Sequence, residues 1–307
     1  MEITLALGGG GVRGVAHIGV IRTLEKYDFK IRAIAGTSAG GLVGAVYSAG
    51  FSTEEIEAAF NEMKDDWSFS RNSEDNPSLL GFSNIAPKLQ SLLGDKTFDD
   101  LPIPFAATAV SLSSGNEIIL RKGKVIDAVM ATIAIPGVFP CQEIGGRVLM
   151  DGGVLDPVPV EVARWMNPEL PVVAVTLHNT PEGWKADETA MPLPIPGPQQ
   201  IVDRIAKLRP VQAFKIFTRA SDVSSHHLTE LAMQLYQPEI IISPQVGHIG
   251  VLQKIDTAEL IEIGCKATET AIQAIKDETN WTKTIQRKVK NRIVPPSVPH
   301  YWEIIED

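Results

Sequence analysis

The sequence predicts an α/β fold built on parallel strands, and three observations indicate it. Residues 3–35 run in the order strand, glycine loop, helix, strand, which is a βαβ unit with a right-handed crossover. The strand at 31–35 then passes through a tight glycine turn into a helix of small residues. Further short apolar runs farther along the chain alternate with helical patterns, as in a sheet that is covered by helices.

The composition is typical of a globular protein that is large enough to bury a sizeable core. The chain has 307 residues, of which 44% are hydrophobic and 21% charged. A net charge of -9 argues against a general nucleic-acid binder, whose partner is a polyanion. The two cysteines, Cys141 and Cys265, fit neither a metal-binding spacing nor a disulfide framework, so we expect a reducing compartment.

We expect a cytoplasmic location, because the sequence shows neither the pattern of a signal peptide nor that of a membrane-spanning helix. The first seven residues lack a basic stretch and lead straight into glycines, unlike a signal peptide. No uninterrupted apolar run reaches the roughly 18 residues that a membrane-spanning helix needs.

The elements of the first third follow from local patterns. Residues 3–7 form a short apolar run, and residues 15–26 carry an apolar helical stripe. Ser52 and Glu55 have the spacing of a capping box, which predicts a helix to about residue 63. Residues 65–100 are irregular apart from a short helix at 86–93, and we expect a lid, a substrate-facing flap or a surface insertion there.

The remaining elements alternate between strands and helices. The sequence predicts strand pairs within 103–121 and 142–150, strands at 171–177 and 239–243, helices at 125–133, 158–166, 199–236 and 256–276, and a proline-rich loop at 181–198.

The turn at Gly36-Thr37-Ser38-Ala39-Gly40 has the pattern of a nucleophile elbow. A serine on a sharp strand-to-helix turn adopts strained φ/ψ angles, and side chains at Gly36 or Gly40 would clash. The start of the following helix favours negative charge near Ser38. An ordinary tight turn is the alternative for this stretch alone.

The first glycine loop has two interpretations. Gly9, Gly11 and Gly14 satisfy the dinucleotide-binding pattern, which also needs an acidic residue at the end of the second strand. That strand ends in Ile-Ala-Gly-Thr-Ser at 34–38 and lacks the acid. We therefore favour an oxyanion hole, in which bare glycine amides face a developing negative charge.

A nucleophilic serine needs a base, and Asp151 is the best candidate. It follows the apolar run at 148–150 and precedes Gly152 and Gly153, which leave space around it, although an ordinary turn aspartate is the alternative. The histidines are weaker candidates, because none lies in an obvious catalytic loop; they include His17, His178, His226, His227 and His248.

Together, three motifs resemble those of the patatin-like phospholipase family. They are Gly-Gly-Gly-x-Arg-Gly at 9–14, Gly-x-Ser-x-Gly at 36–40 and Asp-Gly-Gly at 151–153, in this order, with Ala-x-Pro and Phe-Pro between 134 and 140. The resemblance runs over residues 3–177 and more weakly to about 276. It implies a three-layer α/β/α fold with a mostly parallel sheet.

The same resemblance implies a lipid acyl hydrolase that uses a Ser-Asp dyad. Ser38 would be the nucleophile and Asp151 the base, while Gly9, Gly10 and Gly11, with Arg13, would form the oxyanion hole. It implies a lipid or fatty-acyl ester as the substrate and no metal or cofactor. A non-enzymatic regulatory or adaptor protein on the same fold is the alternative.

Two positions depart from the family pattern. Gly8 stands where plant members have aspartate, and Cys141 stands where a second proline is frequent. Neither position belongs to the proposed dyad, so we expect effects on fine structure or substrate choice.

The C-terminal segment reverses the sign of the chain's charge. We expect a hydrolase domain at 1–277 and a basic tail at 278–307. Residues 281–293 carry five basic residues and no acid, with Trp281, Ile285, Val289 and Ile293 at helical spacing. We expect this apolar stripe to dock on the domain, and peripheral attachment to anionic lipid is the alternative.

Overall fold

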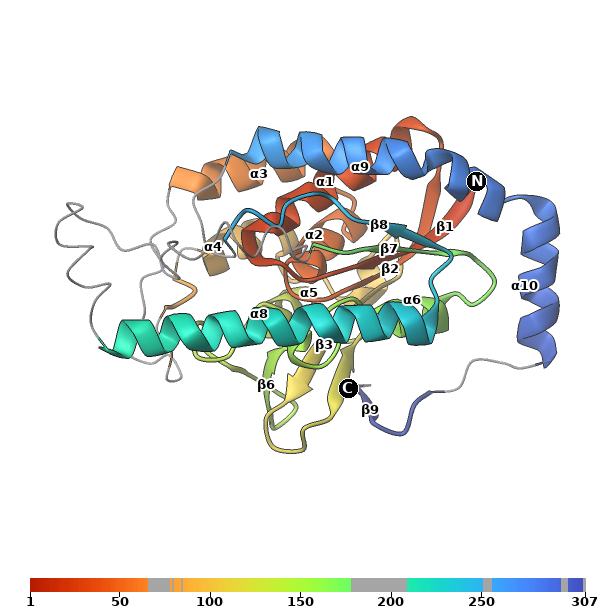
Figure 1. Cartoon of the computed structure of the whole chain (residues 1–307). Helices are drawn as coiled ribbons and strands as arrows, with labels where there is room; N and C mark the ends of the chain where they lie inside the picture. Colours follow the sequence, from red (N-terminus) through yellow and green to blue (C-terminus); the bar gives the residue numbers. More distant parts are fainter. Residues whose placement is uncertain are drawn as a thin grey trace.

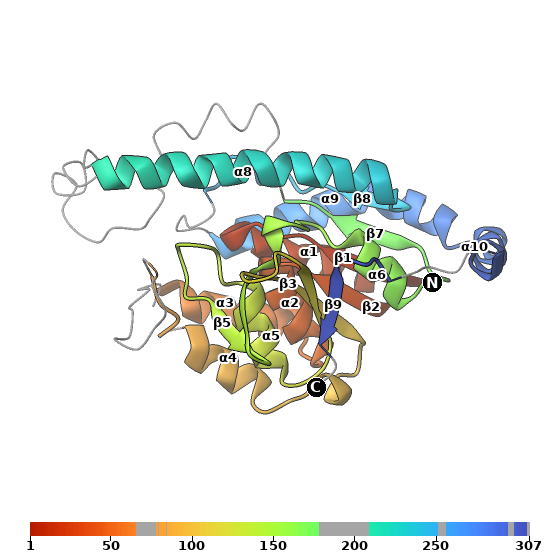
Figure 2. The same cartoon turned by 90° about the horizontal axis from the view of Figure 1, so that it is seen from below.

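A computed structural model describes residues 1–65, 78, 80–83, 85–177, 209–250, 256–293 and 298–305. Within these residues the chain forms a three-layer α/β fold around a mixed, mostly parallel sheet (Figures 1 and 2). The strands are β1 (Glu2–Leu7), β2 (Lys30–Gly36), β3 (Phe105–Ser111), β4 (Glu117–Leu120), β5 (Gln142–Ile144), β6 (Arg147–Asp151), β7 (Val172–Val175), β8 (Ile240–Ile242) and β9 (Trp302–Ile305).

The helices agree with most of the sequence predictions. They are α1 (Ala16–Lys26), α2 (Ala39–Ser48), α3 (Thr53–Asp65), α4 (Ile85–Leu93), α5 (Val125–Thr132), α6 (Val160–Met166), α8 (Arg209–Tyr236), α9 (Thr257–Glu278) and α10 (Trp281–Ile293), with 3-10 turns η1 (Gly11–Val15), η2 (Phe98–Asp100) and η3 (Gly152–Val154). The predicted capping box is confirmed, because Ser52 and Glu55 exchange hydrogen bonds at the start of α3.

The sheet has a parallel centre and an antiparallel margin. Its order is β5-β6-β3-β2-β1-β7-β8, and β4 and β9 extend it beyond β3. Strands β3, β2, β1, β7 and β8 run parallel, whereas β4 and β6 pair antiparallel with β3 and β5 pairs antiparallel with β6. The carboxyl ends of the central strands therefore meet at one edge of the sheet, where ligands bind in open α/β folds.

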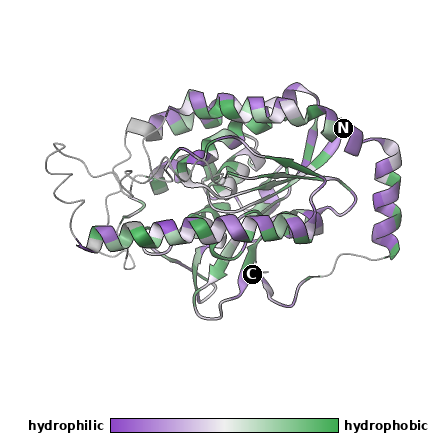
Figure 3. Ribbon diagram, viewed as in Figure 1, coloured by the Kyte–Doolittle hydropathy of each residue, from purple (hydrophilic) through white to green (hydrophobic). Residues whose placement is uncertain are grey.

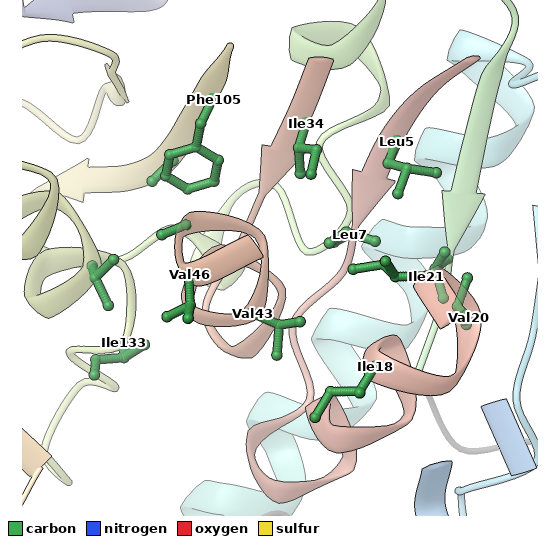
Figure 4. Packing of buried hydrophobic residues seen from close by; sticks show 14 of the residues in the cluster. Leu5, Leu7, Ile18, Val20, Ile21, Ile34, Val43, Val46, Phe105 and Ile133 are labelled. Atoms are coloured by element: carbon green, nitrogen blue, oxygen red, sulfur yellow. The ribbon is translucent and has the colours of Figure 1, made fainter. Parts of the chain in front are cut away.

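Alternating side chains on the central strands divide the core into two layers. Leu5 and Leu7 of β1 point to one face and pack with residues of α1, α2, α5 and α9. Figure 4 shows part of this cluster. Ala6 and Ala35 point to the other face, where they pack against α6. These two buried faces explain why the strands read as continuous apolar runs.

Two parts of the chain differ from the expectation or lie outside the described residues. Residues 302–305, for which the sequence predicts no element, form β9, which pairs parallel with β4. The described part of helix α8 is Arg209–Tyr236, so the helix continues without a break from Pro210 to Tyr236. The loop predicted at 181–198, the start of the helix predicted at 199–236 and residues 66–77, 79 and 84 of the irregular stretch predicted at 65–100 lie outside the described residues. The domain division at residue 277 stays a prediction.

Among the described residues, no helix is both long and apolar enough to cross a lipid bilayer. The central strands are mostly hydrophobic, whereas α8, α9 and α10 carry hydrophobic and hydrophilic residues mixed along their length (Figure 3).

Candidate active site

Ser38 lies on the strained turn that its sequence pattern predicts. Its backbone adopts φ 54° and ψ −123°, which a non-glycine residue rarely occupies, and α2 begins at the next residue. A side chain at Gly36 would place its Cβ 2.6 Å from the carbonyl oxygen of Gly40, and one at Gly40 would overlap the backbone of Leu7. The two glycines are therefore sterically required for this turn.

Strand β3 brings Asp151 to Ser38. The first half of β3 pairs with β2, with Ala107 opposite Gly36, and its second half pairs with β6, with Ala109 opposite Asp151. Strand β4 pairs with β3 across both halves, opposite β2 at Ala107 and opposite β6 at Ala109. Strand β6 therefore lies on the same side of β3 as β2. Strands β2 and β6 thus meet end to end along one side of β3, and Ser38 and Asp151 follow at their junction.

The two side chains are joined by a short hydrogen bond. Ser38 Oγ donates to Asp151 Oδ2 at 2.6 Å, and the amide of Gly153 donates to Asp151 Oδ1 at 2.8 Å. Both residues are buried, with 6% and 5% of their surface exposed. Burial raises the pKa of Asp151 to about 6, although the hydrogen bonds from Ser38 and Gly153 oppose this rise. The carboxylate is therefore a better proton acceptor near neutral pH than an exposed aspartate.

The two glycines after Asp151 have different contacts. A side chain at Gly152 would overlap Thr108 on β3, so only glycine fits there. Gly153 supplies the amide that holds Asp151.

The glycine loop lies against the serine, but its amides have different partners. A Cβ atom at Gly9 would lie 3.2 Å from Ser38 Cβ. The amide of Gly9 donates to the carbonyl of Pro157 at 2.9 Å, so it is engaged within the fold. In the part of the chain that the structure describes, the amides of Gly10 and Gly11 donate to no acceptor. These two amides are therefore unpaired donors among the described residues of the loop.

Arg13 and His17 hold the glycine loop from behind. Arg13 is buried, and its Nε donates to the carbonyl of Ile249 at 2.5 Å, which ties the segment after β8 to the loop. His17 Nε2 lies 2.8 Å from the carbonyl of Gly8, so Nε2 carries the proton that it donates. Burial lowers the pKa of His17 to about 4, which keeps the imidazole neutral. In the structure, then, the side chain of Arg13 is engaged with residue 249, and its role in an oxyanion hole stays a prediction.

Three threonines at the site were not found by sequence reasoning. Thr132, at the end of α5, accepts the amide of Ser38 on its Oγ1 at 2.8 Å, which supports the strained turn. Thr37 Oγ1 bonds to Thr108 Oγ1 at 2.7 Å and to the carbonyl of Asp156 at 2.9 Å. Threonines are common in any chain, so no local pattern distinguishes these from the others.

A second carboxyl pair is linked to this network. Glu117 on β4 is buried, its Oε2 accepts from Trp302 Nε1 of β9 at 2.7 Å, and Asp156 lies beside it. Burial and, to a lesser extent, the neighbouring Asp156 raise the pKa of Glu117 well above its usual value.

The remaining histidine candidates lie elsewhere or outside the described residues. His226 and His227 lie within α8 and contact Glu230, and His178 is outside the described residues. Among the residues that the structure describes, no three His, Cys, Asp or Glu side chains form a cluster suited to a metal ion.

Comparisons with known proteins agree with the motifs. A family model described as patatin-like phospholipase matches residues 5–164. An NTE family protein of Mycobacterium bovis is 36% identical over 183 residues, which are 59% of this chain and 51% of that protein. An NTE family protein of Mycobacterium tuberculosis is 30% identical over 289 residues, 90% of this chain and 47% of that protein. The chain thus spans about half the length of these relatives.

More distant similarities extend to a mammalian protein and to solved structures. Patatin-like phospholipase domain-containing protein 6 of Mus musculus is 29% identical over 192 residues, 59% of this chain and 14% of that protein. The crystal structure of VipD from Legionella pneumophila superposes with a TM-score of 0.47 at 12% identity, over 90% of this chain and 67% of that one. The type III effector ExoU superposes with a TM-score of 0.41 at 14% identity, over 90% of this chain and 53% of that one.

Proposed function

The chain belongs to the patatin-like phospholipase family, a family of lipid hydrolases, and we propose that it cleaves acyl esters of lipids with a Ser38–Asp151 dyad. The observation that carries this proposal is the 2.6 Å hydrogen bond from Ser38 Oγ to Asp151 Oδ2. A buried nucleophile and a base within such reach, close to a loop with unpaired backbone amides, are the parts that acyl transfer needs.

The reaction would proceed in two halves. Asp151 accepts the proton of Ser38 as Oγ attacks the ester carbonyl, and the amides of Gly10 and Gly11 stabilise the oxyanion. Asp151 then gives this proton to the departing alcohol oxygen, which leaves an acyl ester on Ser38. In the second half, Asp151 takes a proton from water, the resulting hydroxide attacks the acyl group, and Ser38 recovers its proton as the fatty acid leaves.

The surroundings of the dyad support this division of roles. Burial brings the pKa of Asp151 to about 6, nearer to neutral pH, where a general base is most effective. The amino end of α2 lies directly behind Ser38 and favours the negative charge that develops there.

The narrower parts of this function remain proposals. They include the phospholipase, lysophospholipase or esterase type of substrate, peripheral contact with a membrane and a cytoplasmic location. Activity of the whole protein is also a proposal, because the chain spans about half of its curated relatives.

Labelling with a fluorophosphonate tests the proposal directly, since this probe modifies activated serines. We expect the label on Ser38, with hydrolysis of a short-chain p-nitrophenyl ester lost in Ser38→Ala. Ser48→Ala is the matched control, because Ser48 is also buried on α2 but makes no hydrogen bond through its side chain within the described residues. Ester hydrolysis that survives in Ser38→Ala would refute the dyad, and a protein that neither reacts nor hydrolyses would favour the regulatory alternative.

A further inference from the structure

Helix α10 has its polar face toward the domain, opposite to the predicted orientation. Arg287 is only 9% exposed, and its guanidinium donates to the side chain of Glu278 at 3.2 Å and to the backbone carbonyl of the same residue. Asn291 donates to the carbonyl of Pro168, and Lys288 pairs with Glu169 at 3.4 Å. The expectation that the apolar stripe docks on the domain is therefore wrong, because polar contacts hold this helix.

The apolar stripe of α10 faces away from the domain. Trp281 and Ile293 are each 75% exposed, and Ile285 and Val289 are exposed between them. A shallow groove on this face is lined chiefly by Ile285, Val289 and Ile293. Four apolar side chains over three turns form a continuous surface rather than scattered exposed residues.

Two exposed basic side chains accompany this stripe. At about 100° per residue, Arg292 falls between Trp281 and Ile285 in the last turn of the helix, whereas Lys290 falls about 60° beyond Ile293. Neither cation forms an ion pair within the described residues. The helix contains no acidic residue, in a chain whose net charge is -9. Apolar side chains flanked by long cationic ones are typical of helices that lie in a lipid interface.

We propose that α10 docks on the surface of an anionic lipid bilayer, with its apolar stripe among the acyl chains and Lys290 and Arg292 at the headgroups. The helix is the outermost element at its end of the molecule, where a flat surface can reach its whole length (Figures 1 and 2). A second copy fits this face less well, because two stripes face to face would bring their flanking cations together.

The docking surface lies at the other edge of the sheet from the candidate active site. Its inward contacts, Pro168 and Glu169, precede β7, at the amino ends of the parallel strands, whereas Ser38 follows the carboxyl end of β2. Helix α10 is therefore an anchor separate from the chemistry, and this inference goes beyond the proposed hydrolysis.

Vesicle sedimentation of the full chain tests the anchor. We expect the wild-type protein to pellet with vesicles of equal parts phosphatidylglycerol and phosphatidylcholine, and much less with phosphatidylcholine alone. Ile285→Glu/Val289→Glu should abolish pelleting, and Lys290→Ala/Arg292→Ala should weaken it about fivefold per charge removed. Leu231→Glu/Leu235→Glu is the matched control, because it adds the same charge to exposed leucines of α8 and should pellet as the wild type does.

Three results would overturn the proposal. They are a wild-type protein that stays in the supernatant, an Ile285→Glu/Val289→Glu variant that pellets normally, and light scattering that shows a wild-type dimer which this variant dissociates. Ser38→Ala separates the anchor from catalysis, since it should pellet fully. Binding by Ser38→Ala without hydrolysis by the wild type would refute the proposed function and leave the anchor intact.

Discussion

The two ends of the sheet break the usual rule of burial in opposite ways. At the carboxyl edge, the hydroxyl of Ser38 and the carboxylate of Asp151 are buried together. At the amino edge, α10 turns Arg287 inward and leaves its apolar stripe in water. Both arrangements carry a cost, since burial disfavours a charged carboxylate and exposed apolar side chains are in contact with water. The two proposals account for both arrangements, since they place a substrate at one end and a lipid surface at the other.

The cost at the carboxyl edge can be estimated. A rise in the pKa of Asp151 from 3.8 to about 6 disfavours its ionised form in the folded protein by about 3 kcal/mol. Such a cost persists in a marginally stable protein when the group serves a function. The following variants test whether the two ends differ as described, from the largest expected effect to the smallest.

Asp151→Asn should give the largest effect, because it removes the base and keeps the shape of the side chain. We expect kcat/KM for ester hydrolysis to fall by about 10³-fold, within the range for loss of a general base. In the wild type, kcat/KM should decrease as the pH is lowered, with a midpoint near pH 6, where Asp151 becomes protonated. Asp99→Asn, at an exposed aspartate, is the control and should leave both unchanged.

Asp151→Asn should lower activity but raise the stability of the folded protein at alkaline pH. Since the folded-state pKa of Asp151 is raised, its contribution to stability is complete below pH 3.8 and is lost as the pH rises through about 6. Asp151→Asn lacks this loss, so its Tm should exceed that of the wild type at pH 8 and not at pH 4. An equal or lower Tm at pH 8 would contradict the burial cost.

Thr132→Val should give an intermediate effect at the same end. It removes the acceptor for the amide of Ser38 and loosens the strained turn, so we expect kcat to fall about 10- to 100-fold with little change in KM. Thr268→Val is the control, because its hydroxyl is also buried but donates to Gly264 within α9. If both variants lose stability alike and neither loses kcat, Thr132 has only a structural role.

Arg287→Ala should give the smallest effect, at the amino edge. It removes the buried guanidinium that holds α10, which we expect to cost about 1–2 kcal/mol of local stability. Hydrogen exchange should then speed up over residues 281–293 with no change in ester hydrolysis. Lys283→Ala removes a more exposed cation from the same partner, Glu278, and should leave exchange almost unchanged. Equal protection in both variants would show that polar contacts do not hold the helix.

The sequence was sufficient where the structure depends on local geometry. Ser38 and its two glycines follow from the turn, and Asp151 followed from a motif order that the fold brings together. It was insufficient for Thr132, whose partner is 94 residues away and is a backbone group. Nor could it show that the amide of Gly9 is engaged by Pro157, because that contact depends on how two loops cross.

Helix α10 and strand β9 show a second kind of limit. Helical spacing identified which residues of 281–293 share a face, but it does not determine which face points inward. Here ion pairs with Glu278 and Glu169 decide that question. Strand β9 is short, and its partner β4 is about 185 residues earlier, so no local pattern announces it.

The end-to-end meeting of β2 and β6 along β3 has a consequence for how the protein acquires reactivity during folding. The turn that holds Ser38 is local, but the carboxylate that accepts its hydrogen bond belongs to Asp151, 113 residues farther along the chain. Asp151 reaches Ser38 only when the β5–β6 hairpin pairs with β3. A partly folded molecule would therefore present a serine with no base. The time at which refolding protein first reacts with a serine-directed probe should then mark the docking of that hairpin, a late and non-local step.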